Sequence, residues 1–142
     1  MALENSKHPH PHSLIVGTAG WSYPHWEGPV FHKTSRRDWH PVEILSNYLD
    51  CLEINTSFYQ CVSPEVSRLW VNKVQGNRRF RFTAKLYQKF THQRRIEAPD
   101  VGAFKEGLWP VAQAGRLAAV LMQFPWSFRF TPENADFVAR LG

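Results

Sequence analysis

The sequence contains no long apolar run. No hydrophobic stretch reaches the about 18 residues that a membrane-spanning helix needs, and the N-terminus has no hydrophobic signal core. We therefore predict no membrane partner and no export. Cysteine is scarce, with only Cys51 and Cys61, and the strand expected to run away from Cys51 argues against a bridge between them. Two reduced thiols favour a cytoplasmic protein.

Glycine does not occur at the spacing of a dinucleotide or P-loop fingerprint, which excludes a phosphate cradle of either kind. The run Leu14 to Ala19 predicts a short parallel strand buried on both faces. The stretch from Trp21 to Phe31 is rich in aromatics and has no helical period, so it predicts a long loop. Such a loop is either a lid or a wall of a binding site, and Trp21 and Tyr23 are its candidate substrate-binding residues.

The composition is that of a globular domain, with 43% hydrophobic and 14% aromatic residues. Residues 1–13 predict a disordered tail, although its alternating His8, His10 and His12 are also compatible with weak binding of a divalent metal. The domain is expected to span residues 14–142. A net charge of +5 suits a polyanionic partner. Its arginines gather only in two places, which are Arg78, Arg79 and Arg81, and Arg94 and Arg95.

The central segment runs from Cys51 to Gln60 and begins as a strand of alternating character. Side chains on a strand alternate between faces, so Glu53 and Asn55 share one face while Leu52 and Ile54 share the other. A loop with Tyr59 follows. Because carboxylate and amide point together at the end of a strand, Glu53, Asn55 and Tyr59 are candidate site residues.

Two helices are expected around this strand. Asp38 can cap a first helix with an apolar stripe that includes Leu45 and Tyr48. The sequence Ser63-Pro64-Glu65 gives a cap, a proline at the first helical position and an acid in the first turn. The buried stripe predicted for this second helix consists of Val66, Leu69, Trp70 and Val74.

The third predicted strand, Arg79 to Lys85, has the clearest alternation in the chain. Its phenylalanines should face helices, which directs Arg81 and Lys85 to the other side, near Glu53. Unpaired burial of these charges would cost several kcal/mol each, so they should pair with Glu53 or with a ligand. The pair is either a structural ion pair or a catalytic lysine–carboxylate site.

The remaining chain predicts a polar loop with His92, which is either a solvated side chain or a proton carrier. A helix opened by Pro99, a buried strand from Leu117 to Phe124 with Gln123 near its end, and a helix starting at Thr131 follow. Strand and helix thus alternate four times, which predicts an α/β fold with a parallel sheet and right-handed crossovers.

The sequence resembles the N-terminal part of the domain-of-unknown-function 72 family, also called YecE-like, whose members form TIM-type β/α barrels. The resemblance rests on segments in family order and spacing. These are Gly17 to Tyr23 with Trp26, Glu53 to Tyr59, Arg68 to Trp70, Phe80 to Phe82 with Lys85, Thr91-His92, and Gln123 to Pro125 with Phe128 and Phe130.

The resemblance implies about the first four βα units of such a barrel, a half-barrel. Family members continue for about another hundred residues and usually have a proline soon after the strand-three lysine, where this chain has Leu86, Tyr87 and Gln88. A half-barrel exposes strand edges and an apolar flank. We therefore expect either a truncated barrel that self-associates or one completed by a second chain.

Active sites of TIM-type barrels lie at the carboxyl ends of the strands. We expect an enzyme in which Glu53 acts as general acid or base, Lys85 stabilises an anion and His92 moves a proton, on a phosphorylated or sugar-like substrate. Asn55 and Gln123 would orient that substrate. No cofactor is assigned, and one carboxylate with one histidine is too few for a metal site. The alternatives are a nucleic-acid or phosphate-ligand binding module, using the arginines with aromatics from Trp21 to Trp26, and an inactive fragment.

Overall fold

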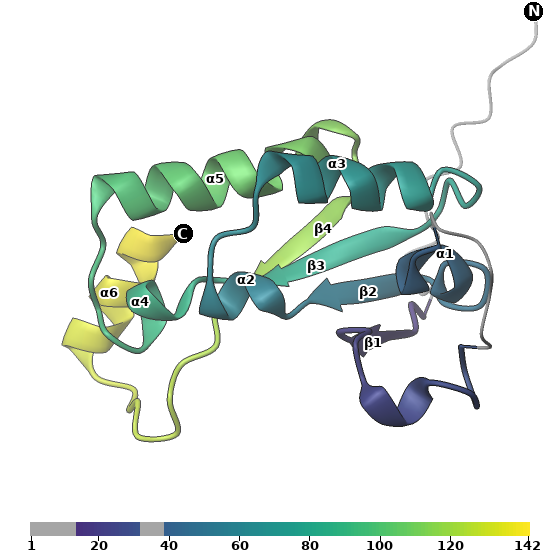
Figure 1. The fold of residues 1–142 in the computed structure, drawn as a ribbon. Helices are drawn as coiled ribbons and strands as arrows, with labels where there is room; N and C mark the ends of the chain where they lie inside the picture. Colours follow the sequence, from purple (N-terminus) through teal and green to yellow (C-terminus); the bar gives the residue numbers. More distant parts are fainter. Residues whose placement is uncertain (1–13, 32–38) are drawn as a thin grey trace, which may run out of the picture.

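The computed structural model describes residues 14–31 and 39–142. Four parallel strands alternate with helices along this part of the chain (Figure 1). The strands are β1 (Gly17–Ala19), β2 (Cys51–Ile54), β3 (Arg81–Lys85) and β4 (Leu117–Leu121). The helices are η1 (Pro24–Trp26), α1 (Pro41–Leu45), α2 (Thr56–Tyr59), α3 (Pro64–Lys73), α4 (Gln88–Thr91), α5 (Ala98–Gln113) and α6 (Pro132–Leu141). The predicted histidine tail and the predicted cap Asp38 lie outside the described residues.

The sheet has the order β1-β2-β3-β4, and every neighbouring pair is parallel. Ala19 is in register with Glu53, and Glu53 with Thr83. The register between β3 and β4 shifts between Phe82 and Thr83. The predicted parallel α/β fold is therefore confirmed. Parallel strands have all their carboxyl ends at one end of the sheet, and in this sheet Glu53 and Lys85 lie at that end.

Local sequence signals fix where most of the longer helices begin. The Ser63 hydroxyl accepts a hydrogen bond from the Val66 amide and Thr131 accepts one from the Asn134 amide, each before a proline at the first helical position. At α1 the acceptor is the Nδ1 atom of His40, 3.2 Å from the Val42 amide nitrogen. The neutral imidazole of His40 thus acts as the N-cap acceptor, a role that an aspartate or serine oxygen usually has.

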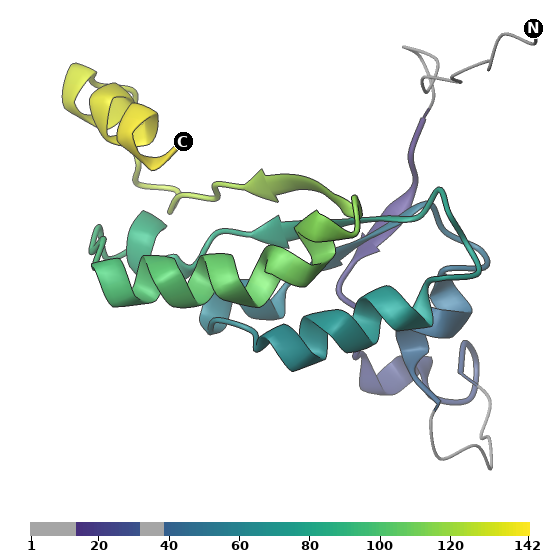
Figure 2. The ribbon, with the colours of Figure 1, turned by 90° about the horizontal axis from the view of Figure 1, so that it is seen from above.

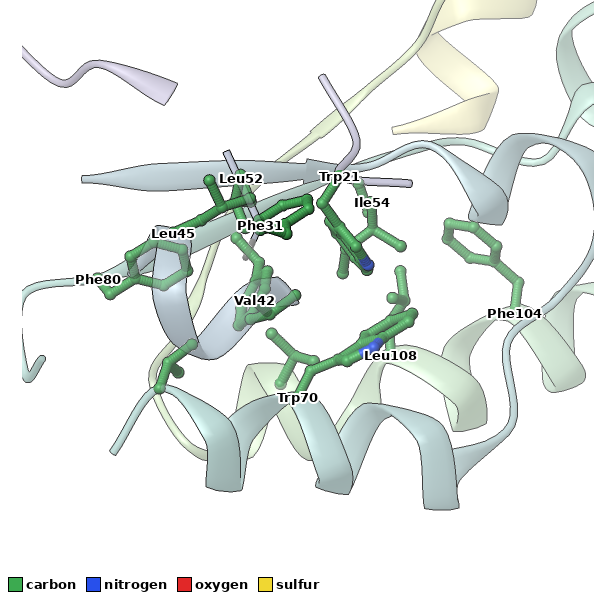
Figure 3. Close-up of a cluster of buried hydrophobic side chains, with 14 of the residues drawn as sticks. Trp21, Phe31, Val42, Leu45, Leu52, Ile54, Trp70, Phe80, Phe104 and Leu108 are labelled. Atoms are coloured by element: carbon green, nitrogen blue, oxygen red, sulfur yellow. The ribbon is translucent and has the colours of Figure 1, made fainter. Parts of the chain in front are cut away.

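The core lies between the sheet and the two long helices. Figure 2 shows α3 and α5 on the same side of the sheet. Buried side chains alternate with half-buried ones along β2 and β3, and the buried ones face these helices. Leu52, Ile54, Phe82 and Ala84 are completely buried there. In Figure 3, Trp21 points into the same layer and meets Trp70 of α3 edge to face, with ring centroids 5.2 Å apart. Neither long helix covers the other face of the sheet.

The edge strands differ from the prediction of strands buried on both faces. Leu14 is 84% exposed and Ile15 54%, and β1 is confined to Gly17–Ala19. In β4, Val120 and Leu121 are also exposed. Each of these strands has only one neighbour in the described sheet. Leu121 is in register with Lys85 on the face that neither long helix covers, whereas Val120 is in register with the buried Ala84 and lines a hollow beside Phe104 and Leu108 of α5.

The predicted buried stripe of α3 is half correct. Trp70 and Val74 are buried, but Val66 and Leu69 are 39% and 42% exposed. Ser67 is buried instead, and its hydroxyl donates to the Gly107 carbonyl of α5. The small side chains at this point allow a close helix crossing, which turns Val66 and Leu69 away from the core. Tyr48, predicted in the first stripe, is 83% exposed because α1 ends at Leu45.

Candidate functional site

The predicted pair of Glu53 and Lys85 is present at the carboxyl ends of β2 and β3. The Lys85 Nζ atom lies 3.6 Å from Glu53 Oε1, and the two side chains are 22% and 18% exposed. Both lie on the sheet face opposite the buried Ile54 and Ala84, since side chains alternate along each strand. In such a pair the carboxyl group can accept or donate a proton, and the ammonium group can stabilise an anion.

Asn55 directly follows β2, two residues after Glu53. Its Oδ1 atom is buried and has no hydrogen-bond partner in the described structure. The Asn55 amide nitrogen and the Glu53 carbonyl are 3.0 Å apart, and the Gly20 amide donates to the same carbonyl at 3.0 Å. Two amides therefore converge on one oxygen and hold the end of β1 against the end of β2.

Gly20 is required where β1 ends. Its φ is +84°, which favours glycine, and a Cβ atom at this position would lie 3.2 Å from Asn55 Nδ2 and 3.4 Å from the Tyr23 hydroxyl. Tyr23 donates its hydroxyl proton to the Ala19 carbonyl. Tyr23 and Asn55 therefore both lie beside the end of β1, and their roles as site residues stay predictions.

Ser57 positions the lysine strand and has no assigned role in the sequence prediction. Its side chain is completely buried, and its hydroxyl oxygen lies 2.6 Å from the Ile54 carbonyl and 2.7 Å from the Lys85 carbonyl. One hydroxyl thus links the carboxyl ends of β2 and β3. The signal that could have identified it is a small hydroxyl residue directly after a strand end, in a segment otherwise expected to be an exposed loop.

His92 belongs to a neighbouring aromatic group. Its ring meets Phe58 edge to face at 5.1 Å between centroids, and Tyr59 meets Phe58 at the same distance. His92 Nδ1 is 2.9 Å from the hydroxyl oxygen of the buried Thr91. Since α2 follows β2 and α4 follows β3, this group lies at the same end of the sheet as the Glu53 and Lys85 pair. His92 and Tyr59 are exposed, as is Gln123 two residues beyond β4.

Two predicted assignments change in the structure. Trp21 was expected to bind substrate, but it is only 8% exposed and packs on Trp70 in the core, so it is not available to a ligand. Arg81 was expected near Glu53, but it is level with Cys51 at the opposite end of the strand, because the register pairs these two residues. Its Nη1 atom donates to backbone carbonyls instead.

The four arginines of the binding-module hypothesis do not form one surface. Arg79 and Arg81 lie at the start of β3, whereas Arg94 and Arg95 follow α4 beyond its end. Arg94 lies over the ring of Phe137, 4.8 Å from its centroid, and Arg95 forms an ion pair with Glu97 at 2.6 Å. The described residues contain no group of three metal-ligating side chains, and none of their helices is both long and apolar enough to span a bilayer.

Comparison with known proteins assigns the chain to a family. Residues 15–141 match the family described as "Protein of unknown function DUF72". The UPF0759 protein YunF of Bacillus subtilis is 26% identical over 131 residues, which cover 88% of this chain and 44% of YunF. The chain therefore spans less than half the length of this relative.

Solved structures give the same result. A DUF72 family protein from Thermotoga maritima is 27% identical with a TM-score of 0.64, over 92% of this chain and 51% of that protein. One from Enterococcus faecalis has a TM-score of 0.72 at 22% identity, over 89% of this chain and 45% of that protein. The four βα units are thus half of a TIM-type barrel, and the chain belongs to the DUF72 family of proteins of unknown function.

Proposed function

We propose that the chain contributes the acid–base and anion-stabilising part of an enzyme active site, acting on a phosphorylated or sugar-like substrate. In this proposal Glu53 is the general acid or base and Lys85 stabilises negative charge. Asn55 and Gln123 orient the substrate, and His92 moves a proton. Because relatives are about twice as long, the activity of a whole barrel is part of the proposal.

The observation that carries the proposal is the Glu53–Lys85 pair itself. It lies at the carboxyl ends of adjacent parallel strands, on the face that neither long helix covers. Catalytic groups of β/α barrels lie at this carboxyl-terminal end of the strands. An ion pair of this exposure stabilises a protein by only about 1 kcal/mol, since loss of hydration offsets much of the attraction. Stability alone is therefore a weak reason for placing two charges here.

Asn55 supports a ligand that carries hydroxyl groups. Its buried Oδ1 has no donor in the described structure, and an unmet buried acceptor costs about 1–3 kcal/mol. A hydroxyl of a bound sugar would supply that donor, while Lys85 would meet a phosphate or carboxylate. Tyr23, the exposed Tyr59 at the end of α2 and the exposed His92 after α4 follow the carboxyl ends of β1, β2 and β3 and would form the walls of the site.

The test is ligand-induced stabilisation of the purified 142-residue chain, followed by thermal unfolding. The probes are inorganic phosphate, glucose, glucose 6-phosphate and adenosine monophosphate. We expect a sugar phosphate to raise the midpoint more than glucose or phosphate does, because it engages both Lys85 and Asn55. Lys85→Met should abolish this rise, and Lys85→Arg should retain part of it.

The matched control is Lys89→Met. Lys89 pairs with Asp100 of α5 at 3.0 Å, and the two side chains are 31% and 20% exposed. This substitution therefore removes a comparable ion pair elsewhere in the chain. Equal loss of the ligand effect in both variants, or no ligand effect in the wild-type chain, would contradict the proposal.

Two further properties belong to the proposal. Exposed apolar side chains on β4 and before β1 support self-association, which light scattering of the purified chain would show as a mass above that of the monomer. Both cysteines are free thiols, which supports the expected cytoplasmic location.

A further inference from the structure

A group of four arginines lies at the amino ends of β3 and β4, opposite the Glu53–Lys85 pair. Arg78 and Arg79 are exposed in the turn before β3, Arg81 is the first residue of β3, and Arg116 directly precedes β4. Because the two strands are parallel neighbours, their starts lie at the same edge of the sheet (Figure 1). We call these four residues the arginine cluster.

Backbone carbonyls hold two members of the arginine cluster in place. Arg81 Nη1 donates to the carbonyls of Arg78, Arg79 and Phe80 at 3.0–3.1 Å. Arg116 Nη1 donates to the carbonyls of Asn77 at 2.6 Å and Phe80 at 3.1 Å. The two guanidinium groups therefore meet at one oxygen. All these bonds use Nη1, and the other donors of each planar fork make no hydrogen bond with the described residues.

Among the described residues, no carboxylate forms an ion pair with the arginine cluster. Within residues 14–31 and 39–142, no ion pair joins any of its four members to an acidic side chain. Asp50 lies at this end of the sheet, but its Oδ2 accepts from the Val16 amide at 3.2 Å. Burial lowers the pKa of Arg116, and the charges of Arg81 and Arg78 lower it further. Like charges are thus close enough to repel, which an anionic ligand would relieve.

An uncovered aromatic side chain occurs at the same end of the molecule. Tyr48 is 83% exposed. The segment that carries it is tied to the start of β3 on both sides, because Asn77 Nδ2 donates to the Ser46 carbonyl at 2.7 Å and the Arg81 amide donates to the Asp50 carbonyl at 3.0 Å. These hydrogen bonds therefore hold the backbone of the segment that carries Tyr48 near the start of β3.

We propose that the arginine cluster and Tyr48 form a binding surface for single-stranded nucleic acid, separate from the proposed active site. The arginines contact successive phosphates and Tyr48 stacks on a base. Guanidinium groups favour phosphate because their donors match its oxygens. Proteins that bind single strands without sequence preference combine such a basic track with aromatic platforms. A small phosphate ligand would need neither positive charges spread from Arg78 to Arg116 nor an uncovered aromatic ring.

Binding is measured by fluorescence anisotropy of a labelled oligothymidylate of roughly 16 nucleotides, with the full chain, over a series of salt concentrations. The Arg78→Ala/Arg79→Ala variant removes two exposed charges without touching the bonds of Arg81 or Arg116 side chains. The control, Arg68→Ala/Arg140→Ala, removes two exposed charges elsewhere. We expect roughly tenfold weaker binding for the first variant and less than about twofold for the control.

The salt dependence of binding and the effect of Tyr48→Ala distinguish binding at this surface from nonspecific electrostatic attraction. Each phosphate contact on a single strand contributes about 0.7 to the slope of log K against log salt, so the Arg78→Ala/Arg79→Ala variant should lower that slope by about 1.4. Tyr48→Ala should weaken binding roughly fivefold and leave the slope unchanged. Absence of binding at low salt, equal losses in the control, or heparin competing as well as unlabelled oligonucleotide at equal charge would each overturn the proposal.

Discussion

The crossing of α3 and α5 depends on the absence of a side chain at Gly107. A Cβ atom there would lie 2.1 Å from the Val62 carbonyl oxygen, and the Gly107 carbonyl accepts the hydrogen bond from the buried Ser67 hydroxyl. The obstacle is the backbone of Val62, in the segment that leads into α3, so Gly107→Ala can be accommodated only if α5 moves away from that segment. Gly102 lies in the same helix, and a Cβ atom there would meet nothing within 4 Å.

The two glycines give opposite expectations for the same chemical change. Alanine is favoured over glycine inside a helix by about 1 kcal/mol, so Gly102→Ala should stabilise the chain by about 0.5–1 kcal/mol. At Gly107 the same gain is opposed by about 1–3 kcal/mol of overpacking and by about 1 kcal/mol for the strained Ser67 hydrogen bond. We therefore expect a net loss of about 1–3 kcal/mol for Gly107→Ala.

Urea unfolding followed by tryptophan fluorescence and circular dichroism measures both variants. With a denaturant slope of about 2 kcal/mol per molar, the midpoints of the two variants should differ by about 1–2 M. If Gly107→Ala raised the midpoint as much as Gly102→Ala does, the helix crossing would not be as close as described and the reasoning would be refuted.

Two further predictions concern Ser57 and His40. Ser57→Ala should lower the free energy of unfolding by about 1–2 kcal/mol in the same urea assay, because it leaves the Ile54 and Lys85 carbonyls without their shared donor. Burial, and then the charge of Lys73, lower the pKa of His40 below its ordinary value of 6.5, although Glu43 acts in the opposite direction. The unfolded chain therefore binds the His40 proton more readily, so this contribution to stability is complete above pH 6.5 and is lost as the pH falls through the lower folded-state pKa. His40→Asn, which keeps a capping acceptor, should remove this part of the pH dependence in unfolding measured from pH 5 to 8.

The central part of the site could be predicted because two simple rules place it. Alternation along β2 separates Glu53 from the completely buried Leu52 and Ile54, and the βα order makes β3 the neighbour of β2. Together these rules bring Lys85 to Glu53, and the 3.6 Å ion pair confirms their predicted proximity. Their catalytic roles stay a prediction.

Other side chains are placed by contacts that no local pattern encodes. Trp21 could have faced solvent or the core, and the position of Trp70 decides it. Ser67 replaces Val66 and Leu69 in the buried layer because its hydroxyl donates a hydrogen bond to the Gly107 carbonyl of α5. The cap of α1 was missed because a neutral histidine serves as the acceptor, which the usual set of capping residues does not include.

The order of the strands in the sheet also has a consequence for how the chain folds. Each strand pairs only with strands that immediately precede or follow it in the sequence, so every pairing closes a loop of roughly 30 residues, the size of one βαβ unit. A ribosome adds about 5–20 residues per second. Each βα unit can therefore dock on the previous one within seconds of its synthesis, and the sheet can assemble in the direction of translation.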